Sequence, residues 1–415
     1  MDKYIINGGR KTDGSVSVQG AKNSVLPLIA GALLTTDEVI IENCPKISDV
    51  LSMLKLLKKL GVEWRFDEDN LIINSSGLKS CELGNELTKE LRSSIFLLGS
   101  LVARTGCAKL AYPGGCDIGL RPIDLHIFAL KQLGVEISEV GGQLNCIAKS
   151  LTGNEIYLDF PSVGATENAM LASVTARGTT IINNPAKEPE IKDLMNFLNK
   201  MGAKITGAGG DRICIEGVKT LHGVSYKPIP DRIEAGTLLI AGAITGGNIE
   251  LKGVNHENLS PILNKLLNNT CKISVKSDII YLKSGSMLKG FNVETNPYPG
   301  FPTDLQAQVL ALACVSKGVS IIRENIFETR FKHVQELVKL GAKITVKDRI
   351  AIVNGIDRFT GGDVYASDLR GGASLVLAGL NARGVTVVHD IKHVERGYYQ
   401  FDDKLRSLNC DIFKV

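Results

Sequence analysis

The chain has 415 residues, of which 44% are hydrophobic and 22% are charged, and its formal net charge is +4. This composition is typical of a globular protein with a substantial core, and the small net charge without a Lys/Arg-rich run argues against nucleic-acid binding. The longest apolar run, residues 25–34, is too short for a transmembrane helix, which needs about 20 residues. Residues 1–10 lack the basic and apolar segments of a secretory signal.

The predicted elements repeat six times in chain order. Helix-like stretches end at positions that suit a left-handed helix cap. These positions are Gly61, Gly134, Gly202, Thr270, Gly341 and Asn409. A second series precedes β-branched runs in the same phase, at Asp37, Gly106, Gly178, Gly246, Gly318 and Gly384. Each unit is therefore predicted to run helix, strand, helix, then two strands.

The sixth unit ends one strand short, and residues 3–8 form a strand-like segment before the first unit. We therefore expect the N-terminal strand to complete the last unit. Six units exceed what one core normally encloses, so the sequence predicts an α/β protein with two three-repeat domains. The expected domains are 22–229, and 1–21 together with 230–415.

Polar residues stand where the first helix of each unit is expected to begin. They are Lys22, Arg92, Ser162, Asp231, Asp304 and Arg370. Taken alone, Asp231, Asp304 and Ser162 are better explained as helix caps than as ligand-binding residues. Lys22, Arg92 and Arg370 are positively charged, which is unfavourable at the positive end of the helix dipole. A bound anion would explain their presence there. We expect these helix starts to line one cleft between the domains.

The second unit carries an insertion of about four residues, within the Gly-rich segment 112–122. Cys116 on this segment is expected to be exposed and activated by Arg121 and a helix N-terminus. The second helices of later units begin near Arg330 and Arg396. Together with Lys22, Arg92, Arg121 and Arg370 these make six cations, against one or two free carboxylates. This excess predicts a substrate pair carrying several phosphate and carboxylate groups.

The nine cysteines include no C-x-x-C pair and no zinc-like spacing with histidine, so we expect reduced thiols and a cytoplasmic location. Eight cysteines are interpreted as small buried hydrophobic residues. These are Cys44, Cys81, Cys107, Cys146, Cys214, Cys271, Cys314 and Cys410. His126 and His333, inside predicted helices, are interpreted as structural.

Six motifs together resemble the enolpyruvyl transferase family over essentially the whole chain. They are 20–24 (GAKNS), 113–126 (PGGCDIGLRPIDLH), 161–168 (PSVGATEN), 230–236 (PDRIEAG), 299–304 (PGFPTD) and 367–370 (SDLR). The resemblance implies two inside-out α/β barrel-like domains of three α-β-α-β-β repeats each. It also implies transfer of the enolpyruvyl group of phosphoenolpyruvate to the 3′-hydroxyl of UDP-N-acetylglucosamine with release of phosphate, the first committed step of peptidoglycan synthesis.

The resemblance assigns roles to these residues. Cys116 matches the proton donor, which can also form a covalent adduct with phosphoenolpyruvate, and we expect fosfomycin to alkylate it. Asp304 matches the candidate base at the sugar hydroxyl. The remaining matches, in the phosphate pocket and then along the sugar nucleotide, are Lys22, Arg121, Arg396, Arg92, Arg330, Asp368, Arg370, Asn23, Pro122, Ile123, Asp124, Leu125, Ser162, Val163, Gly164 and Ile326. No metal or cofactor is implied. Phe160 stands where some members carry a lysine, which puts one phosphate contact in doubt.

Three alternatives stay open. The sister enzyme 5-enolpyruvylshikimate-3-phosphate synthase shares the fold and the donor but lacks the Cys116 loop. A catalytically silent binding paralogue would have no need of Cys116, Asp304 and all the cations. A repeat scaffold for protein partners would present an exposed apolar face instead of charged helix starts.

Overall fold

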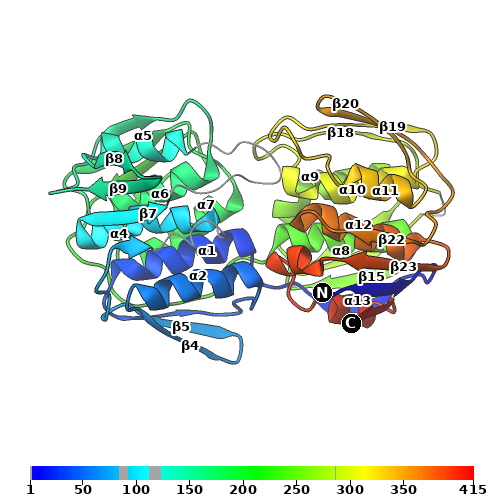
Figure 1. The fold of residues 1–415 in the computed structure, drawn as a ribbon, viewed down its shortest axis with the longest axis horizontal. Helices are drawn as coiled ribbons and strands as arrows, with labels where there is room; N and C mark the ends of the chain where they lie inside the picture. Colours follow the sequence, from blue (N-terminus) through cyan, green and yellow to red (C-terminus); the bar gives the residue numbers. More distant parts are fainter. Residues whose placement is uncertain (1, 84–91, 112–122, 286) are drawn as a thin grey trace. The chain divides into compact units, whose positions relative to one another are not determined.

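The computed structural model describes residues 2–83, 92–111, 123–285 and 287–415. The described residues form two compact units (Figure 1). The N-terminal unit holds 20–83, 92–111 and 123–229, and the C-terminal unit holds 2–19 with 230–415. The chain therefore passes from one unit to the other at 19–20 and again at 229–230.

The described residues form six four-stranded sheets, three in each unit. In sheet order, the N-terminal unit contains β14 (Ser225–Tyr226), β3 (Glu38–Ile41), β5 (Asn70–Asn74) and β4 (Glu63–Asp67); β6 (Glu82–Leu83), β7 (Cys107–Ala111), β9 (Gln143–Ile147) and β8 (Glu136–Val140); β10 (Glu155–Tyr157), β11 (Thr179–Asn183), β13 (Arg212–Glu216) and β12 (Lys204–Thr206). The C-terminal unit contains β2 (Asp13–Ser17), β15 (Asn248–Lys252), β17 (Ile279–Lys283) and β16 (Lys272–Lys276); β18 (Asn292–Glu294), β19 (Val319–Arg323), β21 (Ile350–Asn354) and β20 (Lys343–Lys347); β22 (Asp363–Tyr365), β23 (Val385–His389), β1 (Tyr4–Asn7) and β24 (Asp411–Lys414).

Every sheet begins with a short edge strand that runs parallel to its neighbour, and its other pairings are antiparallel. This edge strand was not predicted, because two to five residues are too few to show a periodicity. β2 pairs with β15 and β14 pairs with β3, so the first sheet of each unit takes its edge strand from a distant part of the chain. β1 lies between β23 and β24, with Tyr4 opposite both Val388 and Lys414.

The first helix of each repeat packs against the other first helices of its unit. These helices are α1 (Lys22–Gly31), α4 (Leu97–Thr105) and α6 (Val163–Ser173), and α8 (Arg232–Thr245), α10 (Gln306–Cys314) and α12 (Leu369–Asn381). Every residue of α10 is buried, and a helix that is apolar on all sides belongs in a core. Figure 1 shows the helices of each unit lying between its sheets, which is the inside-out arrangement and confirms the predicted fold class.

The second helices have one buried and one exposed face. They are α2 (Ser48–Lys59), α5 (Asp124–Gln132), α7 (Pro189–Lys200), α9 (Ser260–Asn268), α11 (Val334–Lys339) and α13 (Phe401–Ser407). Short 3₁₀ helices complete the described elements: η1 (Ala32–Leu34), η2 (Arg92–Phe96), η3 (His256–Leu259), η4 (Thr303–Leu305) and η5 (Ile391–Arg396).

All six predicted cap positions adopt the left-handed conformation. The four glycines have φ between 91° and 100°, and Asn409 has φ 63°. Thr270 has φ 67° although a β-branched residue pays about 1–2 kcal/mol there. Its hydroxyl donates to the carbonyl of Met287 at 2.9 Å, which offsets part of that cost. The fourth repeat therefore keeps the left-handed turn even though Thr270 is a β-branched residue that disfavours this conformation.

Three cysteines differ from the predicted buried, reduced state. Cys81 and Cys107 form a disulfide, and both are half-buried, because the parallel pairing of β6 with β7 brings the starts of these strands together. Cys214 is also half-buried. The remaining described cysteines are buried free thiols, as predicted. Burial raises the pKa of Cys146, for example, to about 11, so these thiols are poor nucleophiles at neutral pH.

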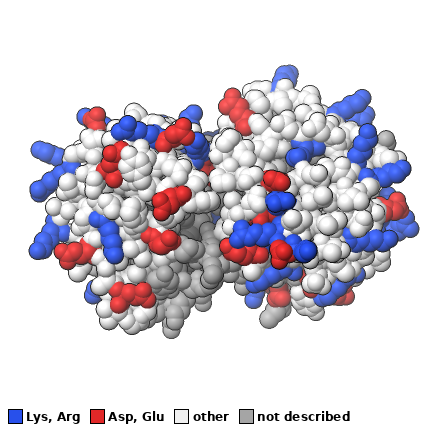
Figure 2. Space-filling view, turned by 90° about the horizontal axis from the view of Figure 1, so that it is seen from above, with Lys and Arg blue, Asp and Glu red and all other residues white. Residues whose placement is uncertain are grey.

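Basic and acidic side chains are interspersed on the face shown in Figure 2. Among the described residues no helix combines the length and apolar character needed to cross a bilayer. The same residues contain no cluster of His, Cys, Asp and Glu able to hold a metal ion.

The disulfide predicts a measurable contribution to stability. Replacing Cys81 and Cys107 together by alanine opens a loop of 26 residues, which should lower the free energy of unfolding by about 2–4 kcal/mol. Urea unfolding with and without a thiol reductant measures this difference. The reductant should lower the wild-type midpoint and leave that of the double variant unchanged, and an unaffected wild-type midpoint would contradict the pairing.

Candidate functional site

In the C-terminal unit the candidate residues meet around the carboxylate of Asp304. One oxygen accepts from Nη2 of Arg330 and the other from Nη2 of Arg370, both at 2.9 Å. Both arginine side chains are only 3% exposed, whereas that of Asp304 is 27% exposed. Burial would lower the pKa of Arg370, but the charge of Asp304 raises it overall. Two fixed cations thus orient a carboxylate that a ligand can still reach.

Asp304 lies in the short helix η4, directly before α10, and is not a helix cap. The cap at the neighbouring helix α12 is Asp368, which accepts from the backbone amides of Arg370 and Gly371 at 3.0 Å. The alternative reading of Asp304 as a cap is therefore wrong, because both of its oxygens bind guanidinium groups.

Three uncharged polar residues hold Asp304 and Arg370 in place. Tyr398 is buried, and its hydroxyl bonds Thr237 at 2.8 Å and the amide of Gln308 at 3.0 Å. The same amide donates to the backbone carbonyl of Asp304 at 3.0 Å, and the guanidinium of Arg370 lies 5.5 Å from the Tyr398 ring centre. Tyr398, Thr237 and Gln308 were not among the predicted site residues, because nothing in their spacing indicates a role.

Glu324 is a further residue near the site that was not predicted from the sequence. It is fully buried and accepts from the hydroxyl of Thr303 at 2.9 Å and from the amides of Ile326 and Phe327 at 2.8 and 3.1 Å. It therefore fixes the sugar-contact candidate Ile326 beside the residue that precedes Asp304. Arg396 is the last residue of η5 and is half-buried.

In the N-terminal unit, Lys22 and Asn23 form the first turn of α1. The ammonium of Lys22 lies 2.7 Å from a carboxylate oxygen of Asp49, at the start of α2. Lys22, Arg330 and Arg370 thus all have carboxylate partners. The expected excess of cations over carboxylates is therefore smaller than the sequence analysis concluded.

The described part of the first predicted sugar-nucleotide stretch, 123–125, lies near the second stretch, 162–164, in this unit. Ser162 caps α6 by accepting from the amide of Ala165 at 3.4 Å, and Val163 and Gly164 form the first turn. A side chain at Gly164 would stand 2.8 Å from Cε1 of His126, so the contact requires glycine. Residues 123–126 and 162–164 are thus neighbours, with Ile123 buried, Leu125 half-buried and Asp124 exposed.

His126 and His333, the two histidines interpreted as structural, are both buried. Nδ1 of His126 lies 2.8 Å from the amide nitrogen of Asn168, which also donates to the carbonyl of Ile95 at 3.0 Å. The Asn168 oxygen accepts from the amide of Gly99, so its nitrogen is the donor and Nδ1 is the unprotonated atom. Burial lowers the pKa of His333 to about 4, which keeps that ring neutral.

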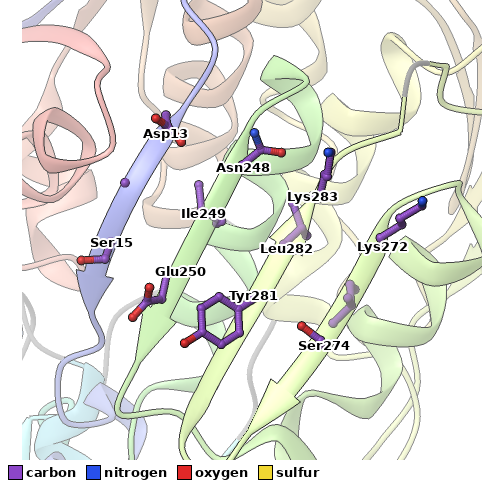
Figure 3. Close-up of a pocket in the computed structure, with 12 residues that line it drawn as sticks. Asp13, Ser15, Asn248, Ile249, Glu250, Lys272, Ser274, Tyr281, Leu282 and Lys283 are labelled. Atoms are coloured by element: carbon purple, nitrogen blue, oxygen red, sulfur yellow. The ribbon is translucent and has the colours of Figure 1, made fainter.

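Cys116, Arg121 and Pro122 lie outside the described residues, and Arg92 begins η2. A hollow of about 650 Å³ lies elsewhere, over the outer face of the sheet formed by β2, β15, β17 and β16 (Figure 3). Tyr281, Glu250, Lys272 and Lys283 line it, and none of the candidate residues does. The candidate residues therefore lie apart from this hollow.

Comparison with known proteins identifies the class. Residues 6–405 match the family model described as EPSP synthase (3-phosphoshikimate 1-carboxyvinyltransferase). The solved structure of the enolpyruvyl transferase NikO from Streptomyces tendae matches with a TM-score of 0.91 and 27% identity, covering 100% of this chain and 99% of the other. An EPSP synthase from Acinetobacter baumannii, at TM-score 0.77 and 20% identity over 100% of both chains, shows the shared fold alone. The chain belongs to the enolpyruvyl transferase family.

Within this family, two full-length curated relatives carry the name of one enzyme. A UDP-N-acetylglucosamine 1-carboxyvinyltransferase 2 from Caldanaerobacter subterraneus subsp. tengcongensis is 48% identical over 416 residues, covering 100% of both chains. One from Clostridium tetani is 48% identical over 417 residues, again covering both chains completely. The resemblance seen in the six motifs is thereby confirmed.

Glu167, in the motif 161–168, predicts an unusual pH dependence of stability. Its carboxyl group is fully buried, and neither oxygen has a hydrogen-bond partner among the described residues. Burial, with the charges of Glu190 and Glu188, raises the pKa of Glu167 well above its ordinary 4.5. The folded protein therefore keeps this proton above pH 4.5 while the unfolded chain releases it, so its contribution to stability falls as the pH rises.

Glu167→Gln removes this penalty. We expect the variant to match the wild type near pH 4 and to become progressively more stable than it above pH 4.5, by at most about 1.4 kcal/mol per pH unit. Urea unfolding from pH 4 to pH 7 measures the difference, with the exposed Glu136→Gln as the control. A difference between Glu167→Gln and wild type that does not change with pH would contradict a buried neutral carboxyl.

Proposed function

We propose that this protein transfers the enolpyruvyl group of phosphoenolpyruvate to the 3′-hydroxyl of UDP-N-acetylglucosamine and releases phosphate. The observation that carries the proposal is the Asp304 carboxylate held between two buried arginines. Curated relatives of the same length, 46–48% identical, bear the name of this activity. The cytoplasm as the place of action, and cell-wall synthesis with its effect on cell shape and division as the purpose, belong to the same proposal.

The proposed reaction is an addition followed by an elimination. As the sugar oxygen bonds to C2 of phosphoenolpyruvate, C3 gains a proton, and the hydroxyl proton passes to a base. Asp304 is suited to be that base, because Arg330 and Arg370 orient its carboxylate and leave part of it exposed. The bond from C2 to the phosphate oxygen then breaks as C3 loses a proton. This releases phosphate and leaves the enolpyruvyl ether.

Cationic groups stabilise the charge that develops on the phosphate. We assign this role to Lys22, Arg121 and Arg396, with Arg92, Arg330 and Arg370 completing the anionic pocket. Residues 121–125 and 162–164 are assigned to the uridine diphosphate, and the contact of Gly164 with His126 supports a joint role for these stretches. Cys116 is assigned as the proton donor to C3.

The choice of acceptor is tested by phosphate release. We expect release when phosphoenolpyruvate is mixed with UDP-N-acetylglucosamine, and none with shikimate 3-phosphate, the acceptor of the sister enzyme. Asp304→Asn should lower kcat by about 10²–10⁴-fold, the usual contribution of general acid–base catalysis. Release only with the shikimate ester would overturn the proposal, and release with neither acceptor would favour a silent binding paralogue.

The role of Cys116 is tested by alkylation. Fosfomycin should add one adduct, on Cys116, because the buried free cysteines have raised pKa values and react slowly. Mass spectrometry of the intact protein and its peptides locates the adduct, and Cys116→Ser should remain unmodified. An adduct on the half-buried Cys214 alone, or no adduct, would contradict the assignment.

A further inference from the structure

The side chain of Gln19 holds the segment that follows Arg396. Gln19 is only 5% exposed and lies three residues before Lys22. Its Nε2 donates to the carbonyl of Gly397 at 3.0 Å, and its Oε1 accepts from the amide of Tyr399 at 3.1 Å. One carboxamide therefore pairs with this segment as a neighbouring strand would. The resemblance assigns no role to Gln19.

The backbone of Gln19 is fixed as firmly as its side chain. Its amide donates to Glu234 at 2.8 Å, and its carbonyl accepts from the amide of Asp231 at 2.9 Å. Glu234 is fully buried, and its second oxygen bonds the ammonium of Lys404 at 2.6 Å. Lys404 also reaches Oε1 of Gln19 at 3.4 Å. The two side-chain hydrogen bonds of Gln19, called the clamp below, are thus supported by the buried ion pair between Glu234 of α8 and Lys404 of α13.

The clamped segment needs such support. It joins η5 to α13 without regular structure, and Gln400 has φ 49°. Buried backbone groups here must find partners, and Gln19 supplies one acceptor and one donor. A side chain at Gly397 would stand 2.7 Å from Leu369, so the segment also lies directly against the start of α12.

Two site residues depend on where this segment lies. Arg396 immediately precedes Gly397, and Tyr398 lies between the two clamped positions. Tyr398 in turn bonds Gln308 and contacts Arg370. A shift of the segment would therefore move Arg396 together with the ring that packs on Arg370.

We propose that Gln19 is a positioning residue for Arg396: its carboxamide sets the place of this cation and contacts no substrate itself. The proposal rests on the proposed function, in which Arg396 faces the phosphate of phosphoenolpyruvate. Gln19 then governs the binding of phosphoenolpyruvate more than that of the sugar nucleotide.

Gln19→Ala tests the proposal by steady-state kinetics. We expect KM for phosphoenolpyruvate to rise about three- to tenfold, the range of one or two hydrogen bonds, with KM for UDP-N-acetylglucosamine within about twofold of wild type. The matched control is Asn269→Ala, which removes a carboxamide that pairs with both backbone groups of Lys289 in the same unit. The control should lose a similar amount of thermal stability and keep both KM values.

Gln19→Glu adds a readout that a merely structural role would not move. In this variant an ionised carboxylate faces the carbonyl oxygen of Gly397 and has no proton to donate, so the two oxygens repel each other. The Gln19→Glu enzyme should therefore bind phosphoenolpyruvate more weakly than the Gln19→Ala enzyme. Protonation restores a donor. Its activity relative to wild type should therefore rise as the pH is lowered.

Hydrogen exchange at the Tyr399 amide measures the clamp independently of the reaction, and it should be faster in Gln19→Ala than in wild type. Unchanged exchange, or an unchanged KM for phosphoenolpyruvate in an active Gln19→Ala enzyme, would overturn the proposal for Gln19. A wild-type protein that releases no phosphate would instead overturn the proposed function.

Discussion

The structure depends on one constraint: the first helix of every repeat is buried over most of its length. A charged group in the middle of such a helix would lose its water without gaining a counter-ion, so charged side chains are favoured only near the ends. In α8, α10 and α12 the polar groups Asp231, Asp304 and Arg370 stand accordingly at the starts. The packing of the core therefore favours the helix starts as positions for charged side chains.

Charges concentrated at buried helix starts must neutralise one another. Asp304 binds Arg330 and Arg370, Lys22 binds Asp49, and Glu234 binds Lys404. A buried ion pair is costly to break, because removing one partner leaves the other charge without water or counter-ion. The same pairing that allows these groups to be buried also fixes the orientation of their charged ends.

The repeat could be predicted because it rests on local rules. A left-handed cap requires glycine or asparagine in most copies, and Thr270 alone departs from this chemistry. The disulfide could not be predicted, because Cys81 and Cys107 are 26 residues apart and meet only when β6 pairs with β7. For the same reason nothing in the sequence marked Tyr398, Gln308 or Gln19, whose roles come from partners more than 60 residues away.

The sequence by itself determined the six repeats, the fold class and the polar residues at the helix starts, since these follow from periodicity and from the backbone preferences of single residues. Only the tertiary structure decided which charges pair, which cysteines join and which edge strand completes each sheet. These depend on segments distant in the sequence: β2 joins β15, β14 joins β3, and Gln19 reaches Gly397. Packing brings them together, and no local pattern records that packing.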